Sequence, residues 1–217
     1  MKEIPVLYEN ADILVVNKPC GIACQGGEGV TVSILEILER QTGDRIYPVH
    51  RLDKDTAGIL VVARSSRSAA EYTRLIASGA LDKQYRAICF GVPTPSSGSI
   101  TVPAGKRGDE KPAETRYRVE RAGEGASLVS LKLLTGRMHQ IRVHLASVGC
   151  PIVADDKYGD FKKNREARSA FGIRKLQLAA VSLEIPVSGT RTRFSIELPE
   201  HMVACLSAFG IGEPLTR

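Results

Sequence analysis

The apolar residues of this chain fall into short runs, each followed by turn-forming residues, and this spacing constrains the fold more than any other feature. Residues 12–17 read Asp-Ile-Leu-Val-Val-Asn and are followed by Lys18-Pro-Cys-Gly21. Residues 58–63 read Gly-Ile-Leu-Val-Val-Ala. Runs that are this short and rich in β-branched residues predict buried β-strands rather than helices.

Later segments come in pairs around short turns, which predicts β-hairpins. Residues 83–91 alternate in polarity as a strand does. The expected hairpins join residues 114–120 to 127–134 around Gly123-Glu-Gly125, and residues 176–187 to 192–198 around Ser188-Gly189. Residues 106–111 mix charges with glycine and are expected to form an exposed loop. Strands joined by such short turns pair antiparallel.

Two helices are expected before residue 80. Residues 31–40 carry apolar side chains at helical spacing, and Gly43 is placed to end the helix. Residues 68–78 begin with Ser68 and, three positions later, Glu71, which is the pattern of a capping box. Both segments therefore read as amphipathic helices that cover a sheet.

A third helix is expected over residues 138–148, where Ile141, Leu145 and Val148 share one buried face and Gly149 ends the helix. Strands in hairpins with a few helices between them predict an α+β protein with a mixed, mainly antiparallel sheet. No glycine-rich loop joins a strand to a helix, so a doubly wound nucleotide-binding sheet is not indicated.

The length of 217 residues allows one large domain or two closely joined halves, with the turn-rich residues 93–98 as the expected boundary. No apolar run approaches the ~20 residues needed to cross a bilayer. Residues 1–8 show no secretory signal, so a cytoplasmic protein is expected. Five scattered cysteines without a C-x-x-C pair argue against a disulfide framework and a zinc site.

The charge balance narrows the choice of partner. Lys and Arg number 30 against 24 Asp and Glu, a net charge of +6. This excess favours a polyanionic partner without establishing one. Trp is absent and aromatic residues make up 5% of the chain, which argues against a stacking platform of many rings.

The first candidate site is the segment His50-Arg-Leu-Asp53-Lys-Asp-Thr-Ala-Gly58. Asp53 lies between Arg51 and Lys54, just before a buried strand. Cationic neighbours favour the charged form of a carboxylate, and an ionised Asp can act as a nucleophile or a base. A turn with solvated surface charges is the alternative interpretation.

The second candidate site is Thr135-Gly-Arg-Met-His-Gln-Ile-Arg-Val-His-Leu145. On the expected helix, His139 and Arg142 are three residues apart and project from one face. Basic and amide side chains near a helix N-terminus suit a phosphate or a carboxylate. An amphipathic helix with a solvated face is the alternative. His139 and His144 are five residues apart, which argues against a shared metal ion.

A third element is the strand segment Lys83-Gln-Tyr85-Arg-Ala87. A tyrosine in a strand is most often part of the core. Its ring could also lie against a base that has been flipped out of a nucleic acid. Both interpretations of Tyr85 stay open at this point.

Together, six segments of the chain resemble the RluA family of pseudouridine synthases. They are Asn17-Lys-Pro-Cys-Gly21, His50-Arg-Leu-Asp53 with Thr56 and Gly58, Lys83-x-Tyr85-x-Ala87, Lys111-Pro-Ala-Glu-Thr115-Arg-Tyr117, Gly136-Arg-x-His-Gln-Ile-Arg-Val-His-Leu145, and Gly149-x-Pro-Ile-x-x-Asp155-x-x-Tyr158-Gly159. They occur in the family's order and spacing and span nearly the whole chain. The departures are Ala57 in place of serine, Ala154 in place of glycine, and residues 178–180, which lack a customary histidine.

The resemblance implies a single catalytic domain over residues 1–217, with a sheet in two halves and an active-site cleft. It implies an isomerase that converts uridine to pseudouridine in tRNA, ribosomal RNA or both. The bond from ribose to the uracil nitrogen breaks, the base rotates, and carbon 5 forms the new bond. No cofactor or metal is implied. The chain starts almost directly at the catalytic core, which resembles the compact branch without a small N-terminal RNA-binding domain.

The resemblance also implies roles for individual residues. Asp53 is the expected catalytic residue, and Arg142 is expected to pair with it, bidentately as only arginine can. Tyr85 would pack on the target base. Arg51 would enter the RNA where the base has left, which offsets part of an unstacking cost of roughly a few kcal/mol. The further expected RNA contacts are Lys18, His50, Lys83, Lys111, Arg137 and His139.

Other functions compete with this one. A glycoside hydrolase would pair Asp53 with Asp55 or Asp155, but it needs an acid of raised pKa, and the cations around Asp53 act in the opposite direction. A non-catalytic RNA-binding protein could keep the fold. A cysteine-dependent enzyme lacks a Cys placed beside a His. For Asp53 itself three roles stay open: attack on the sugar, attack on the base, or removal of a sugar proton. A monomer without an obligate protein partner is expected.

Overall fold

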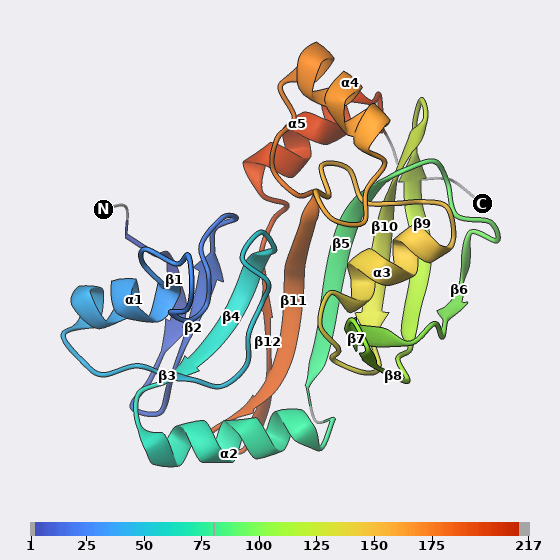
Figure 1. Ribbon diagram of the computed structural model, residues 1–217. Coiled ribbons are helices and arrows are strands. Elements are labelled where there is room, and N and C mark those ends of the chain that lie inside the picture. The colour runs from blue at the N-terminus through green and yellow to red at the C-terminus, as the bar shows by residue number, and fades with distance from the viewer. Residues whose placement is uncertain (1–2, 80, 213–217) are drawn as a thin grey trace. The chain divides into compact units, whose positions relative to one another are not determined.

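A computed structural model describes residues 3–79 and 81–212 (Figure 1). The chain forms two compact units. The first comprises the described residues up to Lys83 together with Ala180–Glu197, and the second comprises Gln84–Ala179 together with the described residues from Leu198 onwards.

The chain passes from one unit to the other at three points. Two lie within strands, between Lys83 and Gln84 in β5 (Asp82–Phe90) and between Ala179 and Ala180 in β11 (Leu178–Val187), and the third lies in a loop, between Glu197 and Leu198. The boundary that the sequence suggested near residues 93–98 does not coincide with any of these changes. The prolines and glycine of that segment instead turn the chain from β5 to the next strand inside the second unit.

The strands of the first unit follow one another across the sheet in the order β1 (Val6–Glu9), β2 (Ile13–Lys18), β4 (Ala57–Ala63) and β11, with β3 (Tyr47–Pro48) on β4 and β12 (Thr190–Ser195) on β11. The antiparallel register of β2 and β4 runs from Ile13 opposite Ala63 to Lys18 opposite Gly58. This register brings the end of β2 to the start of β4, next to the loop that carries Asp53.

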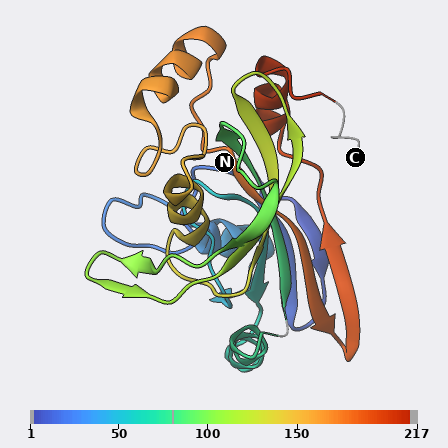
Figure 2. The ribbon, with the colours of Figure 1, turned by 90° about the vertical axis from the view of Figure 1, so that its right-hand side faces the viewer.

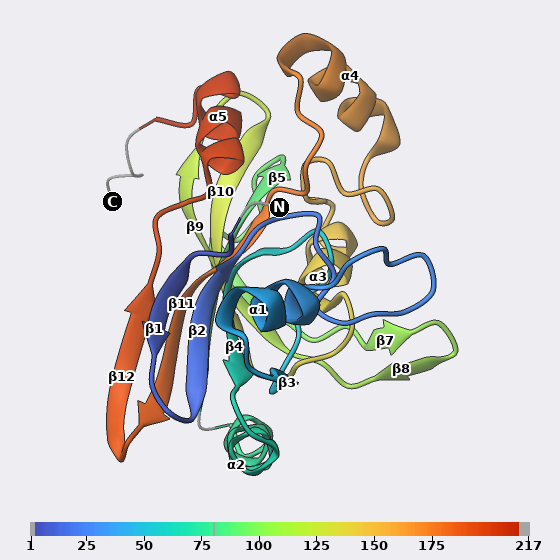
Figure 3. The same cartoon turned by 90° about the vertical axis from the view of Figure 1, so that its left-hand side faces the viewer.

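The central strands β2 and β4 of the first unit are buried on both faces. One core cluster gathers alternate residues of β2 and β4 with a tyrosine of α2 (Ser66–Ala77), among them Ile13, Val15, Ile59, Val61 and Tyr72. Residues of the opposite parity, such as Leu14 and Leu60, are also fully buried. Helix α1 (Ile34–Thr42) lies in front of these strands in the view of Figure 3. Leu14 and Leu60 point to the opposite face from Ile13 and Ile59, because side chains alternate along a strand. Each such side chain contributes about 1.5–3 kcal/mol of transfer free energy.

The C-terminal end of α1 agrees with the sequence, whereas its start, after the N-cap Ser33, lies later than the expected residue 31. The start of α2 also differs from the expectation. Gly43 ends α1 in the left-handed conformation that glycine adopts at low cost, as expected. The N-cap of α2 is Ser65, whose side chain accepts the backbone N–H of Ser68. The expected capping box at Ser68 is wrong because the helix begins earlier, and the Ser68 hydroxyl donates to Asp12 instead, at 2.8 Å.

The second unit contains an antiparallel sheet in the order β5, β10 (Ala126–Leu133), β9 (Thr115–Ala122) and β6 (Ser97–Ile100). The hairpin of β9 and β10 was expected. Residues 104–111, most of which were expected to form a loop, instead form a second hairpin of β7 (Ala104–Lys106) and β8 (Asp109–Lys111), drawn in green in Figure 2. Gly108, with a φ of 84°, allows the tight reversal between these strands.

The second unit contains the helices α3 (Gln140–Ser147), α4 (Phe161–Phe171) and α5 (Glu200–Ala208). The expected helix over residues 138–148 is shorter than predicted because His139 has a φ of 55° and cannot be part of it. Val148, expected in the core, follows the last turn and is 40% exposed. The sequence did not reveal α4, since this helix buries only Ala167 and therefore shows no apolar period.

These elements confirm the predicted fold class, an α+β protein with a mainly antiparallel sheet. The two hairpins that the turn residues indicated are present, as β9 with β10 and β11 with β12. Within the described part of the chain, no helix is both long and apolar enough to span a membrane.

Candidate active site

Asp53 lies on the loop that joins β3 to β4. Its carbonyl oxygen accepts the backbone N–H of Thr56 at 3.1 Å, which closes a tight turn. Leu52 and Thr56 are buried, whereas Asp53 is partly exposed and Arg51 is exposed. Buried residues on either side thus fix the backbone from which Asp53 projects.

Lys18 binds this loop from inside the first unit. Its Nζ donates hydrogen bonds to the carbonyl oxygens of Pro19 at 3.1 Å, Ile22 at 2.8 Å and Lys54 at 2.9 Å. The backbone N–H of Gly21 donates to the same Lys54 oxygen at 3.0 Å. The segment after β2 and the Asp53 loop are therefore joined through one ammonium group.

This geometry contradicts the prediction that Lys18 contacts an RNA phosphate. The side chain is 0% exposed, and all three ammonium protons have carbonyl acceptors. Burial lowers the pKa of Lys18, and the nearby acidic groups, which include Cys24 and Asp53, partly offset that effect. Lys18 acts as an internal cation of the loop.

Cys24 and Gly58 hold the two ends of the same loop. The Cys24 thiol donates to the Leu52 carbonyl oxygen, and its sulfur accepts the Leu52 N–H, both at 3.2 Å. Burial raises the pKa of Cys24, so the group is a thiol rather than a thiolate. A Cβ on Gly58 would lie 2.2 Å from the Ala180 carbonyl oxygen, and its φ is 110°. Only glycine fits at that point.

His50 is a neutral group at the start of the segment. Its Nε2 accepts the backbone N–H of Val61 at 3.1 Å, which assigns the ring proton to Nδ1. Burial, followed by the charge of Lys83, lowers the pKa of His50 well below its usual value. Burial also lowers the pKa of Lys83 to about 8. The expected RNA contacts of His50 and Lys83 stay predictions.

In the second unit, Arg142 of α3 forms a buried bidentate pair with Asp155. Nε donates to Asp155 Oδ2 at 2.8 Å, and Nη2 donates to Asp155 Oδ1 at 2.7 Å and to Asp156 Oδ1 at 2.9 Å. Arg142 is 5% exposed and Asp155 is 0% exposed. The sequence singled out Arg142 but did not identify Asp155 as its partner, although both lie in the segments that carried the family resemblance.

The environment of Asp155 excludes it as the second acid of a glycoside hydrolase. Burial acts to raise its pKa, but the hydrogen bonds from Arg142 and from the backbone amides of Tyr158 and Lys157 outweigh this effect and lower the pKa below its usual value. A buried carboxylate that is held ionised cannot serve as a proton donor.

The backbone around Asp155 is tightly specified. Ala154 has a φ of 59°, which explains why relatives are expected to carry glycine there. A Cβ on Gly159 would lie 2.2 Å from the Asp155 carbonyl oxygen. The Asn164 side chain accepts the Ala154 N–H at 2.8 Å and donates to the Asp155 carbonyl oxygen at 2.9 Å. These contacts fix the carboxylate that orients Arg142.

Tyr158 lies between two of the predicted site residues. The Arg142 guanidinium is 5.4 Å from the centre of the Tyr158 ring, and Tyr158 Oη is 3.1 Å from His139 Nδ1. His139 reaches this position from the left-handed region of backbone space, which is costly for a residue with a Cβ. Sequence analysis did not assign a role to Tyr158.

Gln140 has a structural role beside these residues. Its Nε2 donates to the Glu114 carbonyl oxygen and to Thr115 Oγ1, both at 2.9 Å. Its Oε1 accepts from Thr135 Oγ1 at 2.8 Å and from the Arg137 N–H at 3.0 Å. The side chain is 2% exposed and uses all its hydrogen-bonding capacity to tie the loop before α3 to the start of β9.

The remaining predicted residues differ in accessibility. Tyr85 lies in β5 opposite Leu131 and is 6% exposed. Lys111 is exposed at the end of β8, and Arg137 is exposed with Nε 3.3 Å from the Pro112 carbonyl oxygen. Lys111 and Arg137 are thus open to solvent, as a phosphate contact requires.

Asp53 belongs to the first unit, and Tyr85 and Arg142 belong to the second. The expected pairing of Asp53 with Arg142 therefore stays a prediction. Among the described residues, no three His, Cys, Asp or Glu side chains gather as metal ligands would.

Comparison with known proteins bears on this site. Residues 12–147 match a family described as RNA pseudouridylate synthase. The chain is 37% identical over 224 residues to the ribosomal large subunit pseudouridine synthase C of Pasteurella multocida, covering 95% of this chain and 68% of the relative. It is 36% identical over 218 residues to the protein of the same name from Escherichia coli K12, covering 93% and 68%.

Solved structures with the same fold agree with these matches. The human protein RNA Pseudouridylate Synthase Domain Containing 4 superposes with a TM-score of 0.84 at 25% identity, covering 97% of this chain and 94% of that one. The human protein RNA Pseudouridylate Synthase Domain Containing 1 superposes with a TM-score of 0.79 at 26% identity, covering 99% and 89%.

Proposed function

The chain belongs to the RNA pseudouridylate synthase family, and from that premise we propose that it isomerises uridines of large-subunit ribosomal RNA, with Asp53 as the catalytic carboxylate. Membership makes the protein an isomerase and confirms the resemblance to pseudouridine synthases. The ribosomal substrate comes from the names of the bacterial relatives. A monomer that acts in the cytoplasm, where ribosomal RNA is found, is part of the same proposal.

One observation carries the role of Asp53. It is the partly exposed carboxylate on a loop whose two neighbouring residues, Leu52 and Lys54, are held through their backbones by Cys24 and Lys18. A group held in this way loses little freedom when substrate binds, which favours catalysis through positioning. Asp55 shares the held neighbour Lys54, and its other neighbour, Thr56, donates its backbone N–H to the Asp53 carbonyl oxygen, so the family motif that ends in Asp53 distinguishes the two carboxylates.

In the proposed reaction the target uridine leaves the RNA stack and its base lies near Asp53. The glycosidic bond to the uracil nitrogen breaks, the base rotates, and carbon 5 bonds to the ribose. The proton of carbon 5 passes to water, and the freed uracil nitrogen takes a proton from water, so that the net reaction is an isomerisation. Arg142, oriented by Asp155, is proposed to pair with Asp53, and Tyr85 to pack on the base. Arg51 is exposed beside Asp53 and is proposed to fill the space that the base leaves.

The activity is tested by the fate of the hydrogen on carbon 5. Unmodified transcripts of large-subunit ribosomal RNA and of tRNA are made with uridine tritiated at carbon 5 and incubated with the protein. We expect release of tritium to water from the ribosomal transcript, together with pseudouridine in its nuclease digest.

Other outcomes would change the proposal in distinct ways. Release from tRNA alone would replace the ribosomal substrate and leave the reaction intact. Free uracil without pseudouridine would indicate glycosidic hydrolysis. Tight binding of both RNAs without release would indicate a binding protein that has kept the fold.

A further inference from the structure

The basic charge of the chain is concentrated in one segment of the second unit. Residues 157–175, which include α4, contain seven Lys and Arg and two Asp and Glu, a net charge of +5. The whole chain carries +6. Fewer than a tenth of the residues therefore account for most of the excess that favours a polyanionic partner.

The cations of this segment are exposed, and most have no acidic partner among residues 3–79 and 81–212. The seven are Lys157, Lys162, Lys163, Arg165, Arg168, Arg174 and Lys175. Of these, only Lys163 has a carboxylate within ion-pair distance among the described residues, that of Asp160 at 4.0 Å.

Several arginines elsewhere in the chain are paired with carboxylates. Arg191 and Arg193 both bind Glu184, and Arg86 binds Glu120 at 2.9 Å. Lys162, Arg165 and Arg168 of α4 differ from these arginines because no carboxylate of the described residues lies within ion-pair distance of them.

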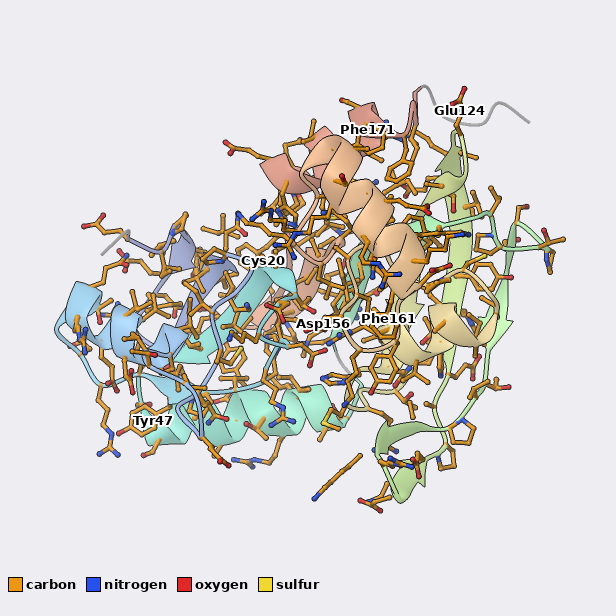
Figure 4. The ribbon with its side chains drawn as sticks, turned by 45° about the horizontal axis from the view of Figure 1, so that its top comes forward. Cys20, Tyr47, Glu124, Asp156, Phe161 and Phe171 are labelled. Carbon is orange, nitrogen blue, oxygen red and sulfur yellow. The ribbon has the colours of Figure 1, made fainter. Side chains whose placement is uncertain are left out.

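The helix presents these charges in an ordered way. Lys162, Arg165 and Arg168 recur every three residues, so they form a stripe on the side away from the single buried residue, Ala167. Phe161 is 55% exposed and lies four residues before Arg165, on the same stripe. Figure 4 shows Phe161 at one end of α4 and Phe171 at the other.

Burial of apolar side chains contributes little to the stability of α4, since only Ala167 is buried, and most of the helix surface is exposed to solvent. Asp160 caps it by accepting the N–H groups of Lys162 and Lys163 at 3.0 Å, and Gly172 ends it with a φ of 69°. Phe171 packs against Phe209 with ring centres 5.6 Å apart. Capping and one aromatic contact thus hold a helix that is polar on nearly every side.

We propose that α4 is a second RNA-binding surface, which contacts the substrate RNA outside the target uridine through the stripe of Lys162, Arg165 and Arg168. The three cations neutralise backbone phosphates, and the ring of Phe161 stacks on an unpaired base beside them. This inference rests on the proposed function, since it takes ribosomal RNA as the ligand.

The test compares two variants with the same loss of charge. In one, Lys162, Arg165 and Arg168 are changed to Gln. In the control, three exposed arginines of the first unit, Arg40, Arg67 and Arg74, are changed to Gln. Gln favours helices, so both variants should fold, and far-ultraviolet circular dichroism checks that they do. Binding of the large-subunit ribosomal transcript is measured from 50 to 300 mM KCl, a range of roughly sixfold in salt.

We expect the α4 variant to bind about tenfold or more weakly near 100 mM salt, with a log–log salt slope shallower by about 2, as the loss of three phosphate contacts on a single strand predicts. The control should match the native chain. Phe161→Ala should weaken binding on the order of fivefold or more with an unchanged slope, because stacking releases no counterions. The kcat/KM for tritium release should fall in step with affinity.

Equal affinity and slope in the α4 variant and the control would overturn the inference. So would a loss of binding to vesicles of anionic phospholipid with RNA binding intact, since the partner would then be a membrane surface. Failure of the proposed function is a separate result, because the native chain would then release no tritium from any transcript, whatever its affinity.

Discussion

The ammonium group of Lys18 donates a 2.9 Å hydrogen bond to the backbone carbonyl oxygen of Lys54, the residue that follows Asp53. Lys18 ends β2, and Lys54 lies in the loop before β4. Burial of an ammonium group without a carboxylate partner costs free energy. The three hydrogen bonds that Lys18 donates to carbonyl oxygens offset this cost. The contact therefore fixes the backbone at Asp53.

Replacement of Lys18 by Met should loosen this loop. Met fills a similar volume but leaves three carbonyl oxygens without their donor, so we expect a loss of about 2–4 kcal/mol in the free energy of unfolding. The kcat of tritium release should fall about tenfold or more, and KM should change much less, because the carboxylate is mispositioned rather than removed. Urea unfolding and steady-state kinetics give the two values.

Lys54→Met is the matched control for that change. The Lys54 side chain is exposed and only its backbone oxygen binds Lys18, so this variant should keep both stability and kcat. If Lys18→Met lowered stability but left kcat at the native value, Lys18 would be a structural residue without a positioning role.

The two carboxylates that bind Arg142 should differ sharply in their contribution to stability. Asp155 is 0% exposed and bidentate, whereas the side chain of Asp156 is 83% exposed. We expect Asp155→Asn to cost about 3–5 kcal/mol of unfolding free energy, since it leaves a buried guanidinium poorly paired. Asp156→Asn should cost less than about 1 kcal/mol. Equal losses would show that burial does not govern this cluster.

The contribution of Asp155 to the free energy of unfolding should also depend on pH. Its folded pKa lies below the unfolded value, so its contribution is present above pH ~3.9 and disappears as pH falls through the folded pKa. The stability difference between the native chain and Asp155→Asn should therefore shrink in acid. Urea unfolding between pH 3 and 7, about three pH units above the unfolded pKa at its upper end, measures this difference.

Because Lys83 is buried, we expect the free energy of unfolding to rise in alkaline solution. Burial lowers its pKa from 10.5 to about 8, so between these values the unfolded chain binds more protons than the folded chain. The unfolding free energy must then increase with pH across that window, by about 1–3 kcal/mol. The native chain should gain this stability over Lys83→Met between pH 7 and pH 10. A constant difference between the two proteins would contradict the burial of the charged amine.

The sequence predicted those elements whose signals are local. The hairpin turn at Gly123–Gly125, the strands β2 and β4, and the end of α1 at Gly43 follow from turn chemistry and apolar spacing. It did not predict α4, because a helix that buries one alanine has no apolar period to detect. It also extended α3 too far, since nothing local to His139 announces a positive φ.

The same distinction between local and tertiary signals applies to the residues of the candidate site. Asp53 and Arg142 stand in motifs, so the sequence singled them out and their roles stay predictions, whereas it did not identify Lys18 and Asp155 as the residues that bind to the Asp53 loop and to Arg142. Lys18 was expected to contact RNA, and the sequence did not reveal that it is buried. Its burial depends on the register of β2 with β4, which is a tertiary property. Asp155 lies thirteen residues beyond Arg142, so only the folded backbone around Ala154 and Gly159 reveals their pairing.

The central claim is that Asp53, and not its neighbour Asp55, carries out the reaction. Single-turnover tritium release from the large-subunit ribosomal transcript, with enzyme in excess, measures the chemical step for the native chain, Asp53→Asn and Asp55→Asn. We predict release by the native chain and by Asp55→Asn within about threefold of it, and no release above background by Asp53→Asn, although that variant still binds the RNA. Release by Asp53→Asn at the native rate would contradict this account.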